Sequence, residues 1–148
     1  MLKSKLQEMQ KIILDTNVIV SALISSSILT KILYDIVLTE KVNTCLSEEV
    51  FEEYAAVLNR DKFSKFSNFK AKAEVVLNRL REIAIFYQSG KKVEILTDTS
   101  DNKFLELAAV SAADYLITGN TLDFTMDEFE YTRILTPREY WDNFAPRD

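Results

Sequence analysis

Short apolar runs alternate along the chain with longer amphipathic stretches, a pattern typical of strands separated by helices. Strands are expected where apolar and β-branched residues cluster between polar ones, at residues 11–14, 42–46, 93–96, 115–118 and 133–135. Residues 83–87 close a helical pattern and are equally compatible with a strand. The chain is therefore expected to form a sheet of four to five strands.

Helical periodicity fills the intervals between these strands. Helices are expected over 18–38 (as one or two), from Glu48 onward behind a Ser47 cap, over 70–88, from the turn 98–101 through Ala113, and from Pro137 through Trp141. Because strands and helices alternate, the sequence predicts an α/β fold with a central parallel sheet and helices on both faces.

The chain length and the absence of a linker predict one domain. Of 148 residues, 47% are hydrophobic and 28% charged, with only two glycines and two prolines. We assign residues 11–148 to a single domain and residues 1–10 to an N-terminal extension. That extension is too polar for a signal peptide, and no apolar run reaches the ~18 residues of a membrane span. A cytoplasmic protein without membrane contact is the expectation.

Missing residue types exclude several kinds of catalysis. The sequence has no histidine, one cysteine (Cys45) and two glycines. It therefore lacks the residues for a Ser-His-Asp or Cys-His centre, a disulfide framework, an imidazole-ligated zinc site or a Gly-rich phosphate loop. Cys45 lies in an apolar context and is expected in the core. Carboxylates, hydroxyls, amides and basic side chains remain for chemistry.

Charge is distributed unevenly along the sequence. The net charge is −5, whereas residues 60–92 contain nine basic and three acidic residues, which leaves −11 for the remainder. A basic segment beside an acidic body can bind a phosphate backbone locally, although an ordinary solvated helix face would give the same pattern.

Acidic residues follow several of the predicted strands. Asp15 ends the first one, and the carboxyl ends of parallel strands are where ligands bind in open α/β sheets. In the helix from Glu48, Glu53 falls at the margin of the apolar stripe, whereas Glu52 points away from it. Glu53 is therefore the better candidate for a site and Glu52 for solvent.

Two further acidic positions are expected at the same edge of the sheet. Asp101 is in line with the buried stripe of its helix, formed by Phe104, Leu105, Ala108 and Ala112, whereas Glu106 is expected to point away. After the strand 115–118, Asp123 offers a carboxylate, and Thr118 and Asn120 offer neutral oxygen ligands. Such clustered carboxylates need a cation to stay ionised, and an all-oxygen site selects Mg²⁺ or Mn²⁺.

With these motifs in order, the sequence resembles the PIN-domain ribonucleases, particularly their VapC-like toxin branch. The resemblance covers about residues 11–141 and lies in the stretches LDTNV with Ser21-Ala22, LSEEVFEEY with Val57-Leu58, DTSDNKFLELA, ADYLITGN and LTPREY. It implies a three-layer α/β/α domain. Where close relatives have Thr-Gly-Asp after the strand, this chain has Asn120, while the spacing of Thr118 to Phe124 matches other relatives with Asp123 as the acid. Family members start just before the first strand, so Met9 is an alternative start.

The resemblance implies a Mg²⁺- or Mn²⁺-dependent endoribonuclease that cleaves single-stranded RNA. Asp15, Glu53, Asp101 and Asp123 would be the catalytic metal ligands, and substrate-binding groups would come from Thr16, Asn17, Thr118 and Asn120. The basic segment 60–92 would guide the RNA backbone. Family toxins are usually homodimers and are blocked by a cognate antitoxin protein, so both partners are expected here.

Two alternatives remain open from the sequence. One keeps the fold but assigns a weak or inactive module that binds RNA or a protein partner, with Asn120 marking a decayed site. The other is a small phosphohydrolase or receiver-like α/β domain, which also has an acid at the first strand tip. A haloacid-dehalogenase-type phosphatase would have a second Asp where this chain has Asn17. Fold alone does not separate these activities.

Overall fold

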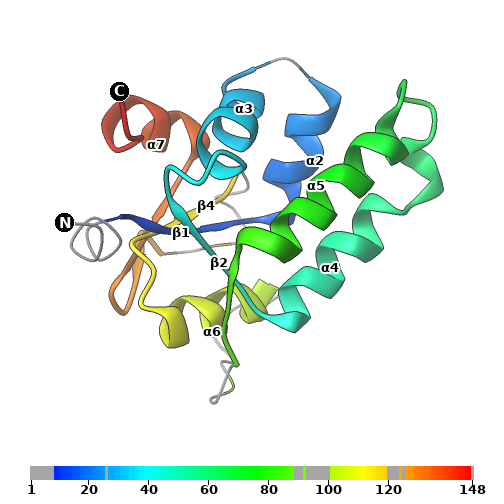
Figure 1. Cartoon of the computed structure of the whole chain (residues 1–148). Helices are drawn as coiled ribbons and strands as arrows, with labels where there is room; N and C mark the ends of the chain where they lie inside the picture. The colour runs from blue at the N-terminus through cyan, green and yellow to red at the C-terminus, as the bar shows by residue number, and fades with distance from the viewer. Residues whose placement is uncertain are drawn as a thin grey trace.

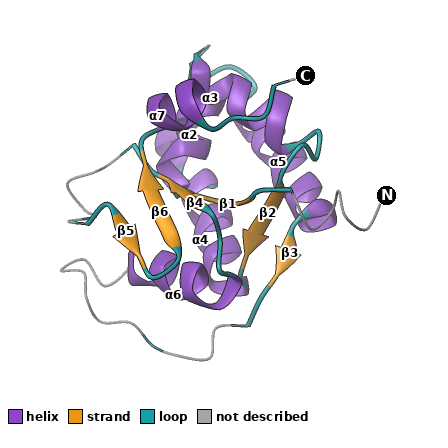
Figure 2. Cartoon of the chain, turned by 90° about the vertical axis from the view of Figure 1, so that its left-hand side faces the viewer, coloured by secondary structure: helices purple, strands orange, loops and turns teal. Residues whose placement is uncertain are grey.

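A computed structural model of the chain describes residues 9–25, 27–88, 92, 101–119, 124 and 126–147. This part contains one mostly parallel sheet in the strand order β3-β2-β1-β4-β6-β5 (Figure 2). The strands are β1 (Lys11–Leu14), β2 (Asn43–Leu46), β3 (Ile85–Phe86), β4 (Tyr115–Ile117), β5 (Glu128–Phe129) and β6 (Thr132–Leu135). Among the described strands, only the short β5 is antiparallel to its neighbour, β6.

Helices cover both faces of this sheet. They are α2 (Thr16–Ile24), α3 (Ile28–Lys31) continuing into the π-helical segment η1 (Ile32–Val37), α4 (Glu48–Leu58), the short 3₁₀ turn η2 (Asp61–Phe63), α5 (Phe69–Ile83), α6 (Asn102–Ser111) and α7 (Pro137–Asn143). In both views α3 and α7 lie on one side of the sheet and α6 on the other (Figures 1 and 2). The α/β class and its layers are thereby confirmed.

The core explains why β1 is central. Ile12 and Ile13 are 0% exposed and Leu14 is 1% exposed, as expected for a parallel strand with helices on both faces. Cys45 of β2 is also completely buried, as its apolar context predicts. No single described helix is long and apolar enough to cross a membrane, and α2 with α3–η1 reaches that length only as a pair bent by 108°.

The strand order contains a switch point between β1 and β4. The chain passes from β1 to β2 and β3 on one side and returns to place β4 and β6 on the other. The connection after β1 and the connection after β4 leave the sheet in opposite directions. This opens a crevice beyond the carboxyl ends of the two strands. Residues that follow β1 and β4 are therefore placed side by side.

Several element boundaries differ from the predicted ones. The sheet has six described strands instead of four to five, because the turn after β5 pairs a two-residue strand with β6. Residues 83–87 divide: α5 ends at Ile83, and Ile85–Phe86 pairs with β2. The helix α6 ends at Ser111, since Ala112 adopts a left-handed conformation with φ 52° and is exposed, not buried as the stripe predicted. The expected strand 93–96 and most of the extension 1–10 lie outside the described residues.

Candidate active site

Asp15 and Thr118 meet at the switch point. The backbone N–H of Asp15 donates to the Ile117 carbonyl at 2.9 Å and so extends the β1–β4 pairing by one step. Beyond it, the Thr118 hydroxyl donates to Asp15 Oδ2 at 2.7 Å. Both side chains are buried, Asp15 to 5% exposure and Thr118 to 0%. Asp15 is therefore a fixed carboxylate at the carboxyl edge of the sheet.

Burial raises the pKa of the Asp15 carboxyl above its ordinary value. The nearby charge of Glu53 acts in the same direction, while the Thr118 hydroxyl and the backbone amides of Thr16 and Asn17 oppose it. Those amides begin α2, and the start of a helix favours a negative charge. Desolvation is the largest of these effects. A cation near Asp15 would relieve the cost of ionising it.

Glu53 approaches Asp15 from α4. Helix α4 begins behind Ser47, whose Oγ accepts from the Val50 amide at 3.2 Å, so the predicted cap is present. Glu53 is half-buried, and its Oε2 accepts a hydrogen bond from the hydroxyl of Thr16, the residue next to Asp15. The neighbouring Glu52 is exposed. The helical stripe therefore predicted the orientation of both glutamates.

Tyr54 fixes α4 to the tip of β1. It is completely buried, and its hydroxyl donates a short hydrogen bond to the Leu14 carbonyl, one residue before Asp15. Burial, followed by the charges of Asp15 and Glu53, raises the pKa of this phenol well above its ordinary value. Tyr54 therefore stays protonated and acts as a permanent donor between helix and strand.

Asp101 occupies the residue before α6 and is partly buried. Its side chain makes no capping hydrogen bond to the helix, although its Oδ2 is a buried atom. Two residues on, the Lys103 ammonium lies 3.0 Å from Glu53 Oε1. The start of α6 thus faces the same part of α4 as Asp15 does. Lys103 was not among the predicted site residues.

Glu106 contradicts its predicted orientation. It was expected to point away from the body, yet it is only 8% exposed. The reason is that α6 is covered by β1 and β2 and also by α4, so that a wider arc of the helix than one stripe is buried. Glu106 follows Lys103 by three residues, and residues at this spacing lie on the same face of a helix.

A hollow of about 440 Å³ lies between α4 and α6 beside these carboxylates. It is lined by Glu49, Glu52, Glu53, Lys92, Lys103 and Glu106. Lys92 approaches Glu106 at 4.0 Å and is itself largely exposed, with 83% of its side chain accessible. The hollow is acidic with two lysines, a composition suited to attracting a cation.

The carboxylate and hydroxyl oxygens at this edge of the sheet are the type of ligand that a hard divalent cation prefers. Asp15 and Glu53 are like charges close enough to perturb each other, and Thr16 adds a hydroxyl between them. Among residues 9–25, 27–88, 92, 101–119, 124 and 126–147, no three His, Cys, Asp or Glu side chains form a closed ligand set. The described chain therefore brings Asp15 and Glu53 together and does not close the cluster with Asp101.

The remaining predicted site residues divide into two groups. Thr16 is buried against Glu53, and Asn17 is exposed with only its backbone amide directed at Asp15. Asn120 and Asp123, on which the fourth position of the site depends, lie outside the described residues, as does Asp98.

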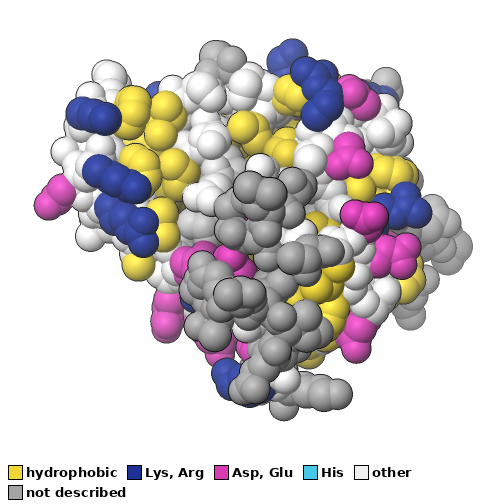
Figure 3. Space-filling model, turned by 180° about the vertical axis from the view of Figure 1, so that it is seen from behind, with side chains coloured by type: hydrophobic (Ala, Val, Ile, Leu, Met, Phe, Trp, Pro, Cys, Tyr) yellow, Lys and Arg dark blue, Asp and Glu magenta, His cyan; other side chains and the backbone are white. Residues whose placement is uncertain are grey.

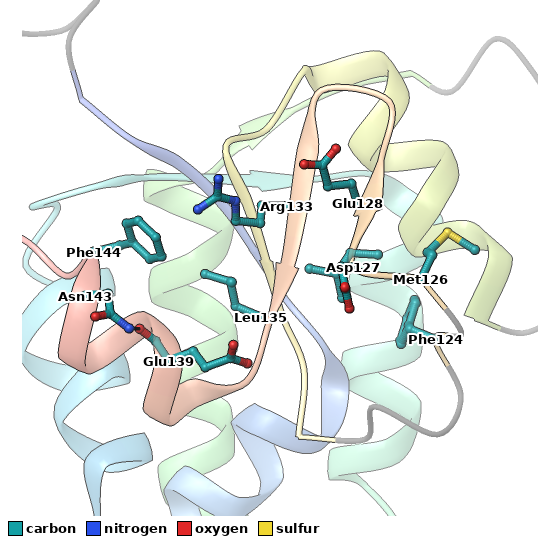
Figure 4. Close-up of a pocket in the computed structure, with 10 residues that line it drawn as sticks. Phe124, Met126, Asp127, Glu128, Arg133, Leu135, Glu139, Asn143 and Phe144 are labelled. Carbon is teal, nitrogen blue, oxygen red and sulfur yellow. Dashed lines mark hydrogen bonds between the residues drawn. The ribbon is translucent and has the colours of Figure 1, made fainter.

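A larger cavity of about 600 Å³ lies elsewhere, between the β5–β6 hairpin and α7 (Figure 4). Two of its polar side chains, those of Glu139 and Arg133, contact other parts of the fold. Glu139 Oε1 accepts from the Thr136 amide at 3.0 Å in the cap of α7, and the Arg133 guanidinium lies 5.3 Å from the centre of the Phe144 ring. Among the described residues, none of the predicted site residues lines this cavity.

Two comparisons relate the chain to known proteins. The PIN domain family model matches residues 11–122, which include β1 through β4 and every described residue of the site. An uncharacterized protein, MJ1680, from Methanocaldococcus jannaschii is 24% identical over 141 residues, covering 90% of this chain and 91% of its own length. PIN domains are generally nucleases, and such nucleases typically use divalent metal ions. The chain belongs to the PIN domain family.

Proposed function

We propose that this protein is a metal-dependent endoribonuclease that cleaves single-stranded RNA. The observation that supports this most directly is the junction of Asp15, Glu53 and Thr16 at the switch point of the sheet, held by Thr118 from β4. Two carboxylates fixed this close favour a bound Mg²⁺ or Mn²⁺. Bound there, such an ion would polarise a phosphate and lower the pKa of a water molecule.

The protein groups would then have separate tasks. Asp15 and Glu53 would hold the metal, with Asp101 and Asp123 as further ligands. Thr118 holds the Asp15 carboxylate in place and favours its ionised form, and the Thr16 hydroxyl holds the Glu53 carboxylate in place. Asn17 is exposed two residues after Asp15, and its side-chain amide would contact the RNA backbone together with that of Asn120. Buried, prearranged carboxylates reduce the reorganisation needed during phosphate attack.

RNA would approach across the connection between α4 and α5. There the Lys62 ammonium lies 5.1 Å from the Phe63 ring centre and Lys65 lies 5.4 Å from that of Phe66. Seen from behind, Lys and Arg side chains adjoin hydrophobic ones along the left edge of the molecule (Figure 3). Basic groups beside aromatic rings suit a strand with a charged backbone and stackable bases.

We further propose that the enzyme is the toxin of a toxin–antitoxin pair, acts as a homodimer and is blocked by a cognate antitoxin. The support is the resemblance of its motifs to the VapC-like branch. Expression of the wild-type chain alone should arrest growth, expression of Asp15→Asn should not, and co-expression of a short neighbouring reading frame should restore growth. Growth arrest by Asp15→Asn would contradict the toxin mechanism.

Cleavage of a labelled single-stranded RNA tests the proposed enzyme. With Mn²⁺ or Mg²⁺ the purified protein should cut it, and EDTA should stop the reaction. Asp15→Asn, Asp101→Asn and Glu53→Gln should each lower the rate by at least about 100-fold, because even partners of metal ligands contribute 10–100-fold. Circular dichroism would verify that each variant is folded.

Asp142→Asn is the matched control, since Asp142 is an exposed carboxylate of α7 that does not line the hollow. It should cleave at nearly the wild-type rate. Equal loss in Asp142→Asn and Asp15→Asn, or full activity of Asp15→Asn, would refute the assigned site.

A further inference from the structure

Lys103 is exposed to two opposing electrostatic influences. It is the second residue of α6, where the positive end of the helix dipole disfavours a cation, but it also lines the acidic hollow. Its ammonium reaches across to Glu53 Oε1 at 3.0 Å, with only 27% of the lysine side chain and 17% of the glutamate side chain exposed. The pairing with Glu53 therefore offsets the unfavourable helix dipole.

Both oxygens of Glu53 are engaged in this arrangement. Thr16 donates to Oε2 and Lys103 to Oε1. A divalent cation that also uses Asp15 would have to share or take over one of these oxygens. Of the two donors, the hydroxyl can remain beside a cation, whereas the ammonium is repelled by it. Lys103 and the metal ion thus require the same carboxylate.

We propose that Lys103 is a positioning residue that neutralises and orients Glu53 in the metal-free protein and is displaced when a divalent cation binds. This inference rests on the proposed metal-dependent function and deepens it. The lysine sets a threshold for metal binding, because the ion must replace an existing ion pair. The same ion pair holds the Glu53 carboxylate at the site and lowers its repulsion with Asp15 before the metal ion binds.

Mn²⁺ titration by isothermal calorimetry tests this role without reference to activity. Lys103→Met should bind Mn²⁺ at least about fivefold more tightly than the wild type, since a competing positive charge is removed from a half-buried carboxylate. Lys103→Arg, which keeps the charge, should bind Mn²⁺ as the wild type does. In EDTA, Lys103→Met should unfold at a lower temperature, and saturating Mn²⁺ should close that gap.

Lys92→Met is the matched control. It removes the same charge from the same hollow, but Lys92 is largely exposed and approaches Glu106 instead of Glu53. Its Mn²⁺ affinity should change less than twofold, because exposed charges are screened. If Lys103→Met and Lys92→Met tighten Mn²⁺ binding equally, the increase in affinity comes from the change in net charge of the hollow. The specific role of Lys103 is then refuted.

The outcomes separate this inference from the proposed function. If the wild type binds Mn²⁺ and Lys103→Met binds it equally or more weakly, the displacement is refuted while the metal-dependent enzyme stands. If the wild type shows no saturable Mn²⁺ binding, the proposed function fails, and the displacement fails with it. Should Lys103→Met fold poorly, Lys103→Gln provides the same comparison with a polar side chain of similar length.

Discussion

Asp15 illustrates how a single residue can be placed for chemistry at the expense of stability. Its carboxylate is buried at the end of β1 and lies near the charge of Glu53, and both conditions raise its pKa. The Thr118 hydroxyl and the first amides of α2 recover only part of the lost hydration. In the metal-free protein the ionised Asp15 therefore opposes folding.

From this follows a prediction about stability. Asp15→Asn should stabilise the metal-free protein at neutral pH by roughly 0.5–2 kcal/mol, the usual range for one favourable substitution. Asparagine retains an oxygen that can accept from Thr118 and removes the buried charge. Thermal unfolding in EDTA measures the change, with Asp142→Asn on the exposed face of α7 as the control.

The pH dependence of that difference has a defined sign. Because the pKa of Asp15 is raised on folding, its protonated form favours the native state, and this contribution is lost as the pH rises through the folded pKa. The advantage of Asp15→Asn should therefore shrink as the pH falls below neutral. An advantage that grows on acidification, or a variant less stable than wild type at pH 7, would contradict the assignment.

At the scale of elements, the site depends on α4 being held at a fixed position against β1. Two contacts do this within two adjacent residues of α4: Glu53 through Thr16, and Tyr54 through the Leu14 carbonyl. Toward the start of α4, the Arg81 guanidinium of α5 lies 4.1 Å from the Phe51 ring centre and binds Glu48. The helix is thus fixed to the sheet at one face and to α5 at another.

Removing the Tyr54 hydroxyl tests the connection between α4 and β1. Tyr54→Phe should lower the free energy of unfolding by about 1–3 kcal/mol, because a buried carbonyl loses its donor. RNA cleavage should also fall, since Glu53 is the preceding residue. Tyr131→Phe makes the same chemical change at an exposed position, where Tyr131 is 69% accessible, and should be neutral in both assays. Equal effects of the two variants would show that the Leu14 contact is dispensable.

The sequence predicts most of these elements but not their terminal details. Apolar runs locate β1, β2, β4 and β6, because strands buried on both faces have a continuous apolar pattern. The division at Ile83 depends on pairing with β2, far away in the sequence, which a local pattern does not contain. The strand β5 pairs with the adjacent β6 but has only two residues, too few to show a strand pattern. Glu106 was misplaced for a related reason: a single helical stripe cannot show that α6 is packed on two sides.

The candidate site was predictable in the same partial way. Asp15 and Glu53 follow from strand ends and helical phase, since each depends on one element. The Lys103–Glu53 pair joins residues fifty positions apart on two helices, and no periodicity links them. Asn120 and Asp123 remain predictions.

On the scale of the whole molecule, charge is divided between an acidic body and the basic segment 60–92, which begins with the aromatic-lined connection from α4 to α5. The segment 60–92 is positive in a chain whose net charge is −5. A net negative charge disfavours general attraction to nucleic acid, so we assign the proposed RNA binding to this region. Orientation of the RNA would follow from this asymmetry.

Reversing two of these charges should show where RNA binds. The double variant Lys62→Glu, Lys65→Glu is made in the Asp15→Asn background to prevent cleavage. It should weaken RNA binding at least about tenfold. The slope of log K against log salt concentration should become shallower by about 1.4, the value for two phosphate contacts on a single strand. Fluorescence anisotropy at several salt concentrations measures both. Lys31→Glu with Arg138→Glu makes the same charge change on α3 and α7, on the other side of the molecule (Figure 1), and should have a small effect. Equal weakening by both pairs would mean that binding follows net charge alone.

The burial of Cys45 has a practical consequence. Its side chain is 0% exposed in β2, and desolvation raises the pKa of its thiol to about 11, so the reactive thiolate is absent near neutral pH. The native protein is therefore silent to thiol reagents. One cysteine introduced on the surface would be the sole target for a fluorophore or spin label, while slow modification of Cys45 itself would report how often β2 separates from its neighbours.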